Sequence, residues 1–336
     1  MSAQLYAVDM FGQSTAPKAS GVVAQRFGFL PFTVLDARSG EWQERKRAWL
    51  AIGIRSEEGR SAPPGGSAMV CGYDADGNRL TGKKVSSKSY NIHGRIEDNL
   101  TSIGISGSVN GDSTSIFDPV LCEMAYRWFC PEGGQIVDPF AGGSVRGIVA
   151  GAMGFDYWGC DLRAEQIAAN NAQADAIETE RRPVWVCGDS MDTMANAPAA
   201  DFVFSCPPYG DLEVYSDDPN DLSTMEWHTF VAAYKRIILR SVQRLKNDRF
   251  ACFVVGDFRD PKGFYRDFVS TTIRAFEECG ARLYNEAILA TSVGSAGMRV
   301  TKQFDASRKM VKTHQNVLVF CKGDPRKAAA ACKAAT

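Results

Sequence analysis

The length of 336 residues exceeds a typical single domain and predicts one large domain with an appended region. A composition that is 45% hydrophobic and 23% charged is ordinary for a globular protein. Its formal net charge of −1 excludes a uniformly basic nucleic-acid-binding protein, so any affinity for DNA must come from local patches. The ten cysteines include no Cys-x-x-Cys pair, which argues against a zinc site and against a disulfide framework.

The sequence contains no signal-peptide pattern and no apolar run long enough to span a bilayer. We therefore expect a cytoplasmic protein with buried, reduced thiols, no metal site and no membrane partner.

The first third of the chain is predicted to be a flexible tail (residues 1–20) followed by an appended region (21–114). Residues 56–115 are rich in Gly and Ser, which is typical of loops that bury little surface. Between Trp42 and Trp49 lie Arg45, Lys46 and Arg47, which form either a phosphate contact or a solvated helix face.

From residue 116 onward, apolar strands alternate with helices, which predicts a parallel sheet. The first four strands are expected at 135–140, 156–161, 183–188 and 201–206. A long helix over 226–246, a strand over 250–255 and a helix over 264–279 follow. The last two strands, 283–290 and 315–320, have no predicted helix between them, so we expect them to pair antiparallel.

The segment between these last strands, residues 294–313, is locally basic. Its cations are Arg299, Lys302, Arg308, Lys309 and Lys312, against Asp305 alone. The composition favours a DNA-contacting loop, with a merely solvated loop as the alternative. Residues 324–336 are alanine-rich and are expected to form a second flexible tail.

Three successive predicted strands each end in an acidic residue, Asp138, Asp161 and Asp189. The first leads into a small-residue turn, Pro139-Phe140-Ala141-Gly142-Gly143-Ser144, that opens a helix. Glycines there let a ligand approach the backbone, and an acid about 20 residues later suits a ribose. The pattern predicts a cofactor pocket at one edge of the sheet.

The fourth strand runs directly into Cys206-Pro207-Pro208-Tyr209. Because proline fixes φ and removes a backbone donor, the two prolines hold the preceding carbonyl and the following ring in set directions. Such a corner suits a site that places a planar base between an aromatic face and a fixed acceptor.

These motifs, in this order, resemble the S-adenosylmethionine-dependent DNA amino-methyltransferases, which modify adenine N6 or cytosine N4. The resemblance covers residues 115–323, and the leading region looks like that of phage-encoded members; it implies a role of the restriction-modification type. It implies a Rossmann-like class I α/β fold with a seven-stranded, mostly parallel sheet, a terminal antiparallel hairpin and an N-terminal appended region.

The resemblance also implies the site. Four segments would bind S-adenosylmethionine. It would be covered by Phe117, Asp118 and Pro119, and its methionine end would be held by Asp138 and the turn from Pro139 through Phe140, Gly142 and Gly143 to Ser144. Its ribose would be bound by Asp161 and Leu162, and its adenine by Asp189 and Ser190. Cys206, Pro207, Pro208 and Tyr209 would be catalytic, with Tyr209 stacking on a base flipped out of the DNA.

The first position of the catalytic motif departs from the family, which has Asp, Asn or Ser where this chain has Cys206. A thiol is a weaker acceptor than a hydroxyl but nearly isosteric with it. Three hypotheses follow: Cys206 replaces serine, Cys206 is a covalent nucleophile of a pyrimidine C5 alkylating enzyme, or the domain is a catalytically weakened regulatory protein that binds DNA or cofactor. The sequence leaves open the target base, the recognition sequence and the oligomeric state.

Overall fold

The computed structural model describes residues 27–55, 117–210, 215–216, 218–291 and 296–333. All of them belong to one compact unit, made of Met1–Gly59 and Ile116–Thr336. The predicted tail over 1–20 and the Gly/Ser-rich stretch over 56–115 lie outside the described residues.

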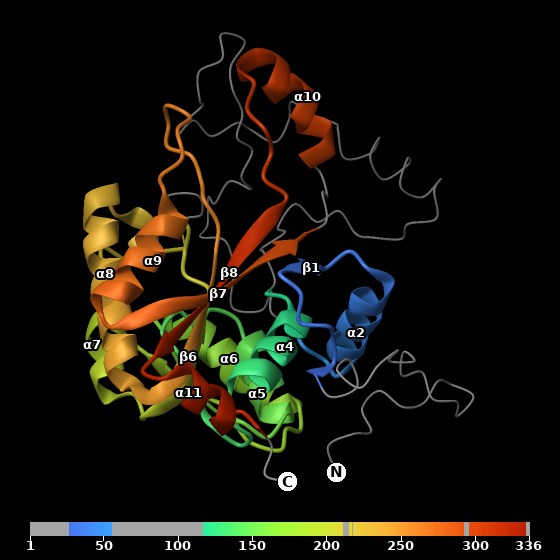
Figure 1. The fold of residues 1–336 in the computed structure, drawn as a ribbon, viewed down its shortest axis with the longest axis vertical. Coiled ribbons are helices and arrows are strands. Elements are labelled where there is room, and N and C mark those ends of the chain that lie inside the picture. Colours follow the sequence, from blue (N-terminus) through green and yellow to red (C-terminus); the bar gives the residue numbers. More distant parts are fainter. Residues whose placement is uncertain (1–26, 56–116, 211–214, 217, 292–295, 334–336) are drawn as a thin grey trace. The chain divides into compact units, whose positions relative to one another are not determined.

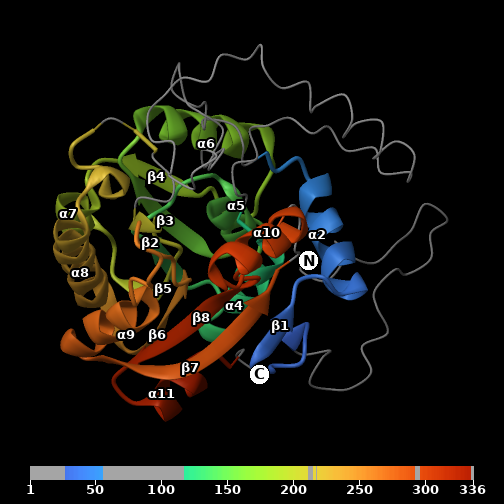
Figure 2. The ribbon, with the colours of Figure 1, turned by 90° about the horizontal axis from the view of Figure 1, so that it is seen from above.

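An eight-stranded sheet forms the centre of this unit, and Figure 1 labels β1, β6, β7 and β8 in it. The strand order is β1-β7-β8-β6-β5-β2-β3-β4, and all eight strands are labelled in Figure 2. Strand β8 is antiparallel to its neighbours β6 and β7, and every other neighbouring pair is parallel. The strands are β1 Val34–Asp36, β2 Gln135–Asp138, β3 Asp156–Asp161, β4 Val184–Cys187, β5 Ala200–Ser205, β6 Leu245–Val255, β7 Ala281–Ala290 and β8 His314–Lys322. Strands β2 to β8 form a mostly parallel, Rossmann-like sheet that ends in the predicted antiparallel hairpin of β7 and β8.

Helices connect these strands and cover both faces of the sheet. They are α2 Gly40–Ala51, α4 Pro119–Phe129, α5 Val145–Ala152, α6 Ala164–Ala176, α7 Ser190–Thr193, α8 Trp227–Arg244, α9 Phe268–Glu278, α10 Ala296–Ser307 and α11 Pro325–Ala331. Figure 2 shows α7, α8 and α9 on one side of the sheet and α2, α4 and α5 on the other.

The core divides into two apolar clusters, one on each face of the sheet. In β5, Phe202 and Phe204 belong to the cluster beneath α4 and α5, whereas Val203 between them belongs to the cluster beneath α8 and α9. This alternation follows from the two-residue period of a strand. Burial on both faces explains why the central strands are continuously apolar in sequence.

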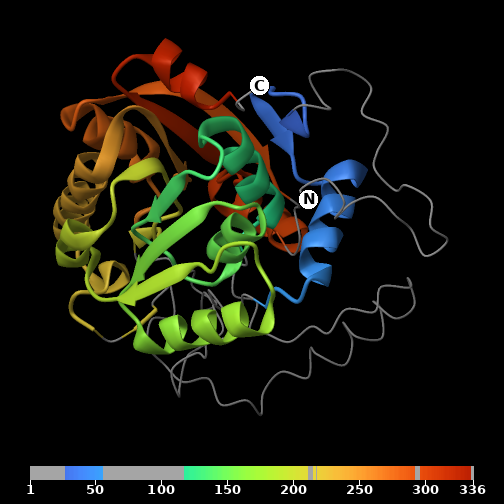
Figure 3. The ribbon, with the colours of Figure 1, turned by 90° about the horizontal axis from the view of Figure 1, so that it is seen from below.

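The described N-terminal residues contribute to the same compact unit rather than standing apart from it. Strand β1 pairs parallel with β7 and adds an eighth strand to the predicted seven. Helix α2 packs on α4, as Figure 3 shows from below, and buries Trp42 and Trp49 there. The predicted boundary near residue 115 therefore divides the sequence but not the core.

Several predicted elements differ in detail from the structure. Strand β6 begins at Leu245, within the predicted helix over 226–246, and β2 ends at Asp138 rather than at residue 140. Residues 264–267 precede α9 instead of belonging to it, because Asp260-Pro261-Lys262-Gly263 turns the chain first. Helix α10 occupies most of the segment that was expected to be a loop. Helix α11 replaces part of the expected C-terminal tail, since Asp324 caps it and Ala328 is fully buried.

None of the helices in the described part of the chain is long and apolar enough to cross a membrane.

Candidate active site

The four predicted motifs lie at the same edge of the sheet. Strands β4, β3, β2 and β5 are consecutive parallel neighbours, so their carboxyl ends point the same way. Asp138 ends β2, Asp161 ends β3, Asp189 follows β4, and Cys206 follows β5. The prediction that these segments share one edge is therefore confirmed, and this is where open α/β sheets bind ligands.

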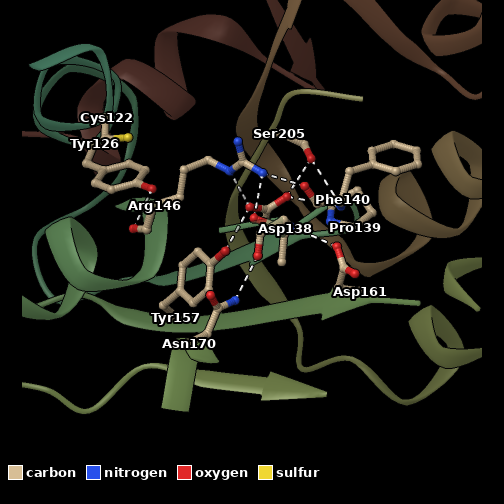
Figure 4. Close-up of polar contacts among 12 residues, drawn as sticks. Cys122, Tyr126, Asp138, Pro139, Phe140, Arg146, Tyr157, Asp161, Asn170 and Ser205 are labelled. Atoms are coloured by element: carbon tan, nitrogen blue, oxygen red, sulfur yellow. Dashed lines mark hydrogen bonds and ion pairs between the residues drawn. The ribbon is translucent and has the colours of Figure 1, made fainter. Parts of the chain in front are cut away.

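Asp138 is fully buried and receives four hydrogen bonds from within the chain (Figure 4). Its Oδ2 accepts from Arg146 Nε at 2.5 Å and from the Tyr157 hydroxyl at 2.8 Å. Its Oδ1 accepts from the Ser205 hydroxyl at 2.5 Å and from the Phe140 amide at 3.1 Å. A carboxylate has about four acceptor sites, so these donors match its capacity and fix its position.

The guanidinium of Arg146 ties the turn after β2 to this carboxylate. Its Nη2 donates to the carbonyl oxygens of Phe140 and Ala141, the latter at 2.8 Å. Burial alone lowers the pKa of Arg146, but the negative charge of Asp138 outweighs it and the pKa is raised. The arginine is therefore a permanent buried cation directly beneath the turn.

Gly142 adopts a φ of +51°, a left-handed conformation that favours glycine, and its main chain is held on both sides. Its amide donates to Asp161 Oδ2 at 2.9 Å, and its carbonyl oxygen accepts from Asn170 Nδ2 at 2.7 Å. Asp161 Oδ1 also accepts the Arg163 amide at 3.0 Å. The ends of β2 and β3 are thus joined through one partly exposed carboxylate.

The last residue of the turn, Ser144, is supported from α6. Its hydroxyl donates to Gln173 Oε1 at 2.8 Å, and both side chains are buried. The same amide group of Gln173 accepts from the Arg55 amide at 3.0 Å and donates to the Arg55 carbonyl oxygen. The Gln173 side chain therefore connects the backbone of Arg55, which follows α2, to Ser144 of the predicted cofactor turn.

The end of β4 joins the same network. Asp189 caps α7 by accepting the Met191 amide at 2.8 Å. Ser190 is buried, and its hydroxyl donates to the Pro139 carbonyl oxygen at 2.5 Å. Leu162 is partly exposed and follows Asp161 directly. The predicted adenine-side and methionine-side segments are consequently in hydrogen-bonded contact.

The segment predicted to cover the cofactor begins α4. Asp118 caps the helix through the Val120 amide at 3.0 Å, and Pro119 occupies its first turn. The Phe117 ring packs edge-on against Phe204, and the Arg146 guanidinium lies over it at 4.7 Å. Phe117 is therefore a neighbour of the turn after β2.

The cations predicted to contact phosphate are instead used largely inside the chain. Arg45 Nη2 donates to the buried Glu123 at 2.8 Å, and Lys46 Nζ donates to Asp118 at 3.1 Å. Of the three, Arg47 alone has an exposed side chain. The structure thus assigns Arg45 and Lys46 to the α2–α4 contact, which the sequence could not reveal because Asp118 and Glu123 lie more than 70 residues away.

The Cys206-Pro207-Pro208-Tyr209 segment, the predicted catalytic corner, adjoins Ser205, which binds Asp138 and the Phe140 amide together. The Tyr209 hydroxyl accepts from Gln315 Nε2 at 2.7 Å and lies 3.8 Å from Cys206 Sγ. Burial, followed by the adjacent Cys206, raises the pKa of Tyr209, so its phenol stays protonated. The Tyr209 ring also meets Phe268 edge-on.

Gln315, near the start of β8, contacts this corner through Tyr209, and sequence analysis did not predict it. Because β8 is antiparallel to β6, its first residues lie at the edge where β6 ends. Lys312 donates to Asn316 Oδ1 at 3.3 Å, and burial lowers the pKa of Lys312, an effect that Asp257 partly offsets. No sequence motif links Gln315 to residues 206–209. The only feature of the sequence that could have indicated this contact is the predicted terminal hairpin.

The other predicted DNA-contacting residues lie in or just after α10. Arg308 is exposed, stacks over the Phe304 ring and pairs with Asp305 at 3.5 Å. Lys309 lies against Gly263 of the loop after β6. Arg299 and Lys302 are within α10, but their side chains lie outside the described residues.

Among the described residues, no group of three or more His, Cys, Asp or Glu side chains could hold a metal ion. A search against models of known protein families finds no match, and a search of curated proteins finds none either.

Solved structures with a similar arrangement include several methyltransferases of low sequence identity. TrmN from Thermus thermophilus is 12% identical with a TM-score of 0.41, and the match covers 61% of this chain but only 49% of TrmN. Precorrin-6y C5,15-methyltransferase from Geobacter metallireducens GS-15 is 11% identical with a TM-score of 0.40, covering 61% of this chain and 88% of that one. Magnesium protoporphyrin IX methyltransferase (ChlM) from Synechocystis PCC 6803 is 10% identical with a TM-score of 0.41, covering 71% and 100%. At this level, the matches carry no argument about substrate.

Proposed function

We propose that this chain transfers a methyl group from S-adenosylmethionine to an exocyclic amino group, adenine N6 or cytosine N4, of a base in DNA. One observation carries the proposal. The Ser205 hydroxyl binds Asp138 and the Phe140 amide, so the glycine turn and the Cys206-Pro207-Pro208-Tyr209 corner are held together at one sheet edge. A methyl donor and its acceptor would meet there.

The side chains at this edge suit S-adenosylmethionine. Asp161 is partly exposed and oriented by the Gly142 and Arg163 amides, which suits a carboxylate that binds ribose hydroxyls. Asp189 with Ser190 would face the adenine, Phe117 with Asp118 and Pro119 would cover the cofactor, and the residues from Pro139 to Ser144 would hold the methionine end. When bound, the cofactor supplies an electrophilic sulfonium methyl group.

Asp138 has a different role in this proposal from the direct contact that the family resemblance implies. Its four internal hydrogen bonds make it a positioning residue, which acts on the turn through Arg146. The buried ion pair holds the Phe140 and Ala141 carbonyl oxygens inward. This leaves the outer surface of the turn to the ligand.

The catalytic corner would orient the amine. Its nitrogen lone pair is delocalised into the ring, so acceptors that hold the N–H bonds out of the ring plane act most strongly in the transition state. The Pro207 carbonyl oxygen and Cys206 would be these acceptors, and Tyr209 would stack on the base. Because a thiol is a weak acceptor, Cys206 contributes less than the carbonyl.

The cations in and after α10 support DNA as the partner, because they can bind its phosphates. Arg308 is exposed, Lys309 is close to the loop after β6, and Arg299 and Lys302 belong to the same short basic segment. A local patch of this kind can bind phosphates although the whole chain carries a net charge of −1.

The test is mass spectrometry of nucleosides from the DNA of cells that express the wild type, Cys206→Ser or Tyr209→Ala. We expect N6-methyladenine or N4-methylcytosine with the wild type and Cys206→Ser, and none with Tyr209→Ala. A base modified at pyrimidine C5 and lost in Cys206→Ser would instead make Cys206 a nucleophile. Unmodified DNA with intact cofactor binding would indicate a regulatory protein.

Cofactor binding is tested separately by calorimetry with S-adenosylhomocysteine. Asp161→Asn should weaken binding at least tenfold, since a charged hydrogen bond is worth about 1.5–3 kcal/mol. Asp156→Asn is the matched control, because Asp156 starts the same strand at the opposite edge. Equal affinities for the two variants would contradict the ribose assignment.

A further inference from the structure

The loop between β6 and α9 contains a rigid hairpin over residues 259–265. Asp260-Pro261-Lys262-Gly263 has proline at the second position and glycine at the fourth, as type I turns favour. The Gly263 amide donates to the Asp260 carbonyl oxygen at 2.9 Å, and the Asp260 amide donates to the Phe264 carbonyl oxygen at 2.8 Å. An antiparallel bridge joins Arg259 to Tyr265. The conformation of the hairpin is therefore fixed by its own bonds.

This hairpin exposes two aromatic rings. Phe264 is 71% exposed and Tyr265 is 49% exposed. The Phe264 amide is bound to Asp260 Oδ1 at 2.9 Å, which orients the residue. Large apolar side chains exposed on a preorganised tip are typical of contact surfaces, because binding then costs little conformational entropy.

Cations surround the two rings. The Arg259 guanidinium lies over the Tyr265 ring at 4.0 Å, and Lys262 is exposed in the turn. Lys309 approaches so closely that a Cβ on Gly263 would be 2.5 Å from its Nζ. Each of the nearby acids accepts a hydrogen bond from within the chain.

Three hydrogen bonds account for these acids. Asp257 Oδ1 accepts the Val269 amide, Asp260 Oδ1 accepts the Phe264 amide, and Asp267 pairs with Arg274. Aromatic faces interleaved with cations match the bases and phosphates of a nucleic-acid strand.

The base of the hairpin packs on the catalytic corner. Phe258 is buried, and a Cβ on Gly210 would be 2.7 Å from its ring. The Phe258 carbonyl oxygen accepts the Arg266 amide at 2.9 Å, which closes the hairpin. Since β6 is the neighbour of β5, the hairpin leaves the sheet beside residues 206–209.

We propose that the hairpin 259–265 is a DNA-binding element in which Phe264 and Tyr265 stack on bases beside the target nucleotide. Lys262 and Lys309 contact the adjacent phosphates. The proposal rests on the proposed function for the identity of the partner. It adds the hairpin, which lies outside the basic stretch over 294–313, and draws only Lys309 from that stretch.

Binding of a short, fluorescein-labelled DNA duplex of mixed sequence, followed by fluorescence anisotropy at low salt, tests the surface. Phe264→Ala and Tyr265→Ala should each raise Kd about fivefold or more, because stacking on a base is lost. Replacing Lys262 and Lys309 by Gln should lower the slope of log Kd against log salt by about 1 for each phosphate contact.

Phe32→Ala and Tyr284→Ala are matched controls. Their side chains are 65% and 48% exposed. Phe32 precedes β1, the edge strand that β7 and β8 separate from β6, and Tyr284 lies in the first half of β7. Unchanged binding in both hairpin variants, or equal losses in the controls, overturns the assignment, and so does a wild type that binds no duplex. Methylated nucleosides and S-adenosylhomocysteine binding are measured independently, so a failure of the hairpin is distinguishable from a failure of the proposed activity.

Discussion

Arg146 and Asp138 form an ion pair of 2.5 Å beneath the turn that joins β2 to α5, with side chains only 6% and 0% exposed. Because Arg146 also donates to two carbonyl oxygens of the turn, the ion pair fixes the backbone conformation of the turn. The strand end, the turn and the first turn of the helix therefore behave as one element.

Removal of the cation should strongly destabilise the protein. Arg146→Met leaves Asp138 charged and buried without its partner, which typically costs about 3–5 kcal/mol. The measurement is the free energy of unfolding in urea. Arg181→Met is the control, since the Arg181–Asp156 pair has side chains 46% and 48% exposed and should contribute less than about 1 kcal/mol. Equal losses in the two variants would show that the buried pair is not special.

Gln173 should couple the N-terminal region to cofactor binding. Gln173→Leu removes the acceptor of the Ser144 hydroxyl and both bonds to the Arg55 main chain. We expect about fivefold weaker S-adenosylhomocysteine binding by calorimetry, the equivalent of about one neutral hydrogen bond. Asn171→Ala, on the same helix, should bind normally. Wild-type affinity in Gln173→Leu would mean that the turn holds its shape without α6.

Cys187 offers a footprint of the bound cofactor. It is exposed, ends β4 and is the register partner of Asp161. Bound S-adenosylhomocysteine should slow its alkylation by iodoacetamide, measured by peptide mass spectrometry, because the ligand would cover that strand end. Cys279 lies just before β7, away from the catalytic edge, and should react at the same rate with or without ligand. Unprotected Cys187 would place the ligand elsewhere.

His314 should titrate below its usual range. Burial and then the nearby charge of Lys312 lower the pKa of His314 from 6.5. The unfolded chain therefore binds the proton more readily, so this group's contribution to stability is present above pH 6.5 and is lost as the pH falls through the lowered pKa. The effect is small because His314 is only partly buried.

An NMR titration of the His314 imidazole measures whether its pKa lies below 6.5. Lys312→Gln should raise the pKa of His314, whereas Lys235→Gln should not, since Lys235 pairs with Glu278 on the surface. A wild-type pKa of 6.5 or higher would contradict the proximity of the two groups.

Sequence periodicity was sufficient to predict the parallel part of the sheet and the edge at which its motifs lie. The apolar runs before Asp138, Asp161 and Cys206 are local, and strands alternating with helices must run parallel, so their carboxyl ends coincide. Strand β1 was not predictable in the same way. Three residues are too few for a period, and β1 exists because β7 offers a free edge for pairing.

The roles of individual side chains depended on contacts between distant parts of the chain. Arg45 and Lys46 look like a basic patch in sequence, yet their partners are Glu123 and Asp118. Asp138 looks like a ligand-binding acid, yet Tyr157 and Ser205 donate to it from two neighbouring strands. Burial and pairing of a charge are properties of the packed molecule, and no local pattern encodes them.

The amino-acid sequence by itself therefore determined the α/β architecture and the edge where the motifs gather, because hydrophobic period and chain order are local and topological properties. Only the tertiary structure decided which of the motif residues face inward as supports, and that the hairpin 259–265 and the start of β8 adjoin the same corner. Those outcomes follow from side-chain packing across strands that are far apart in the chain.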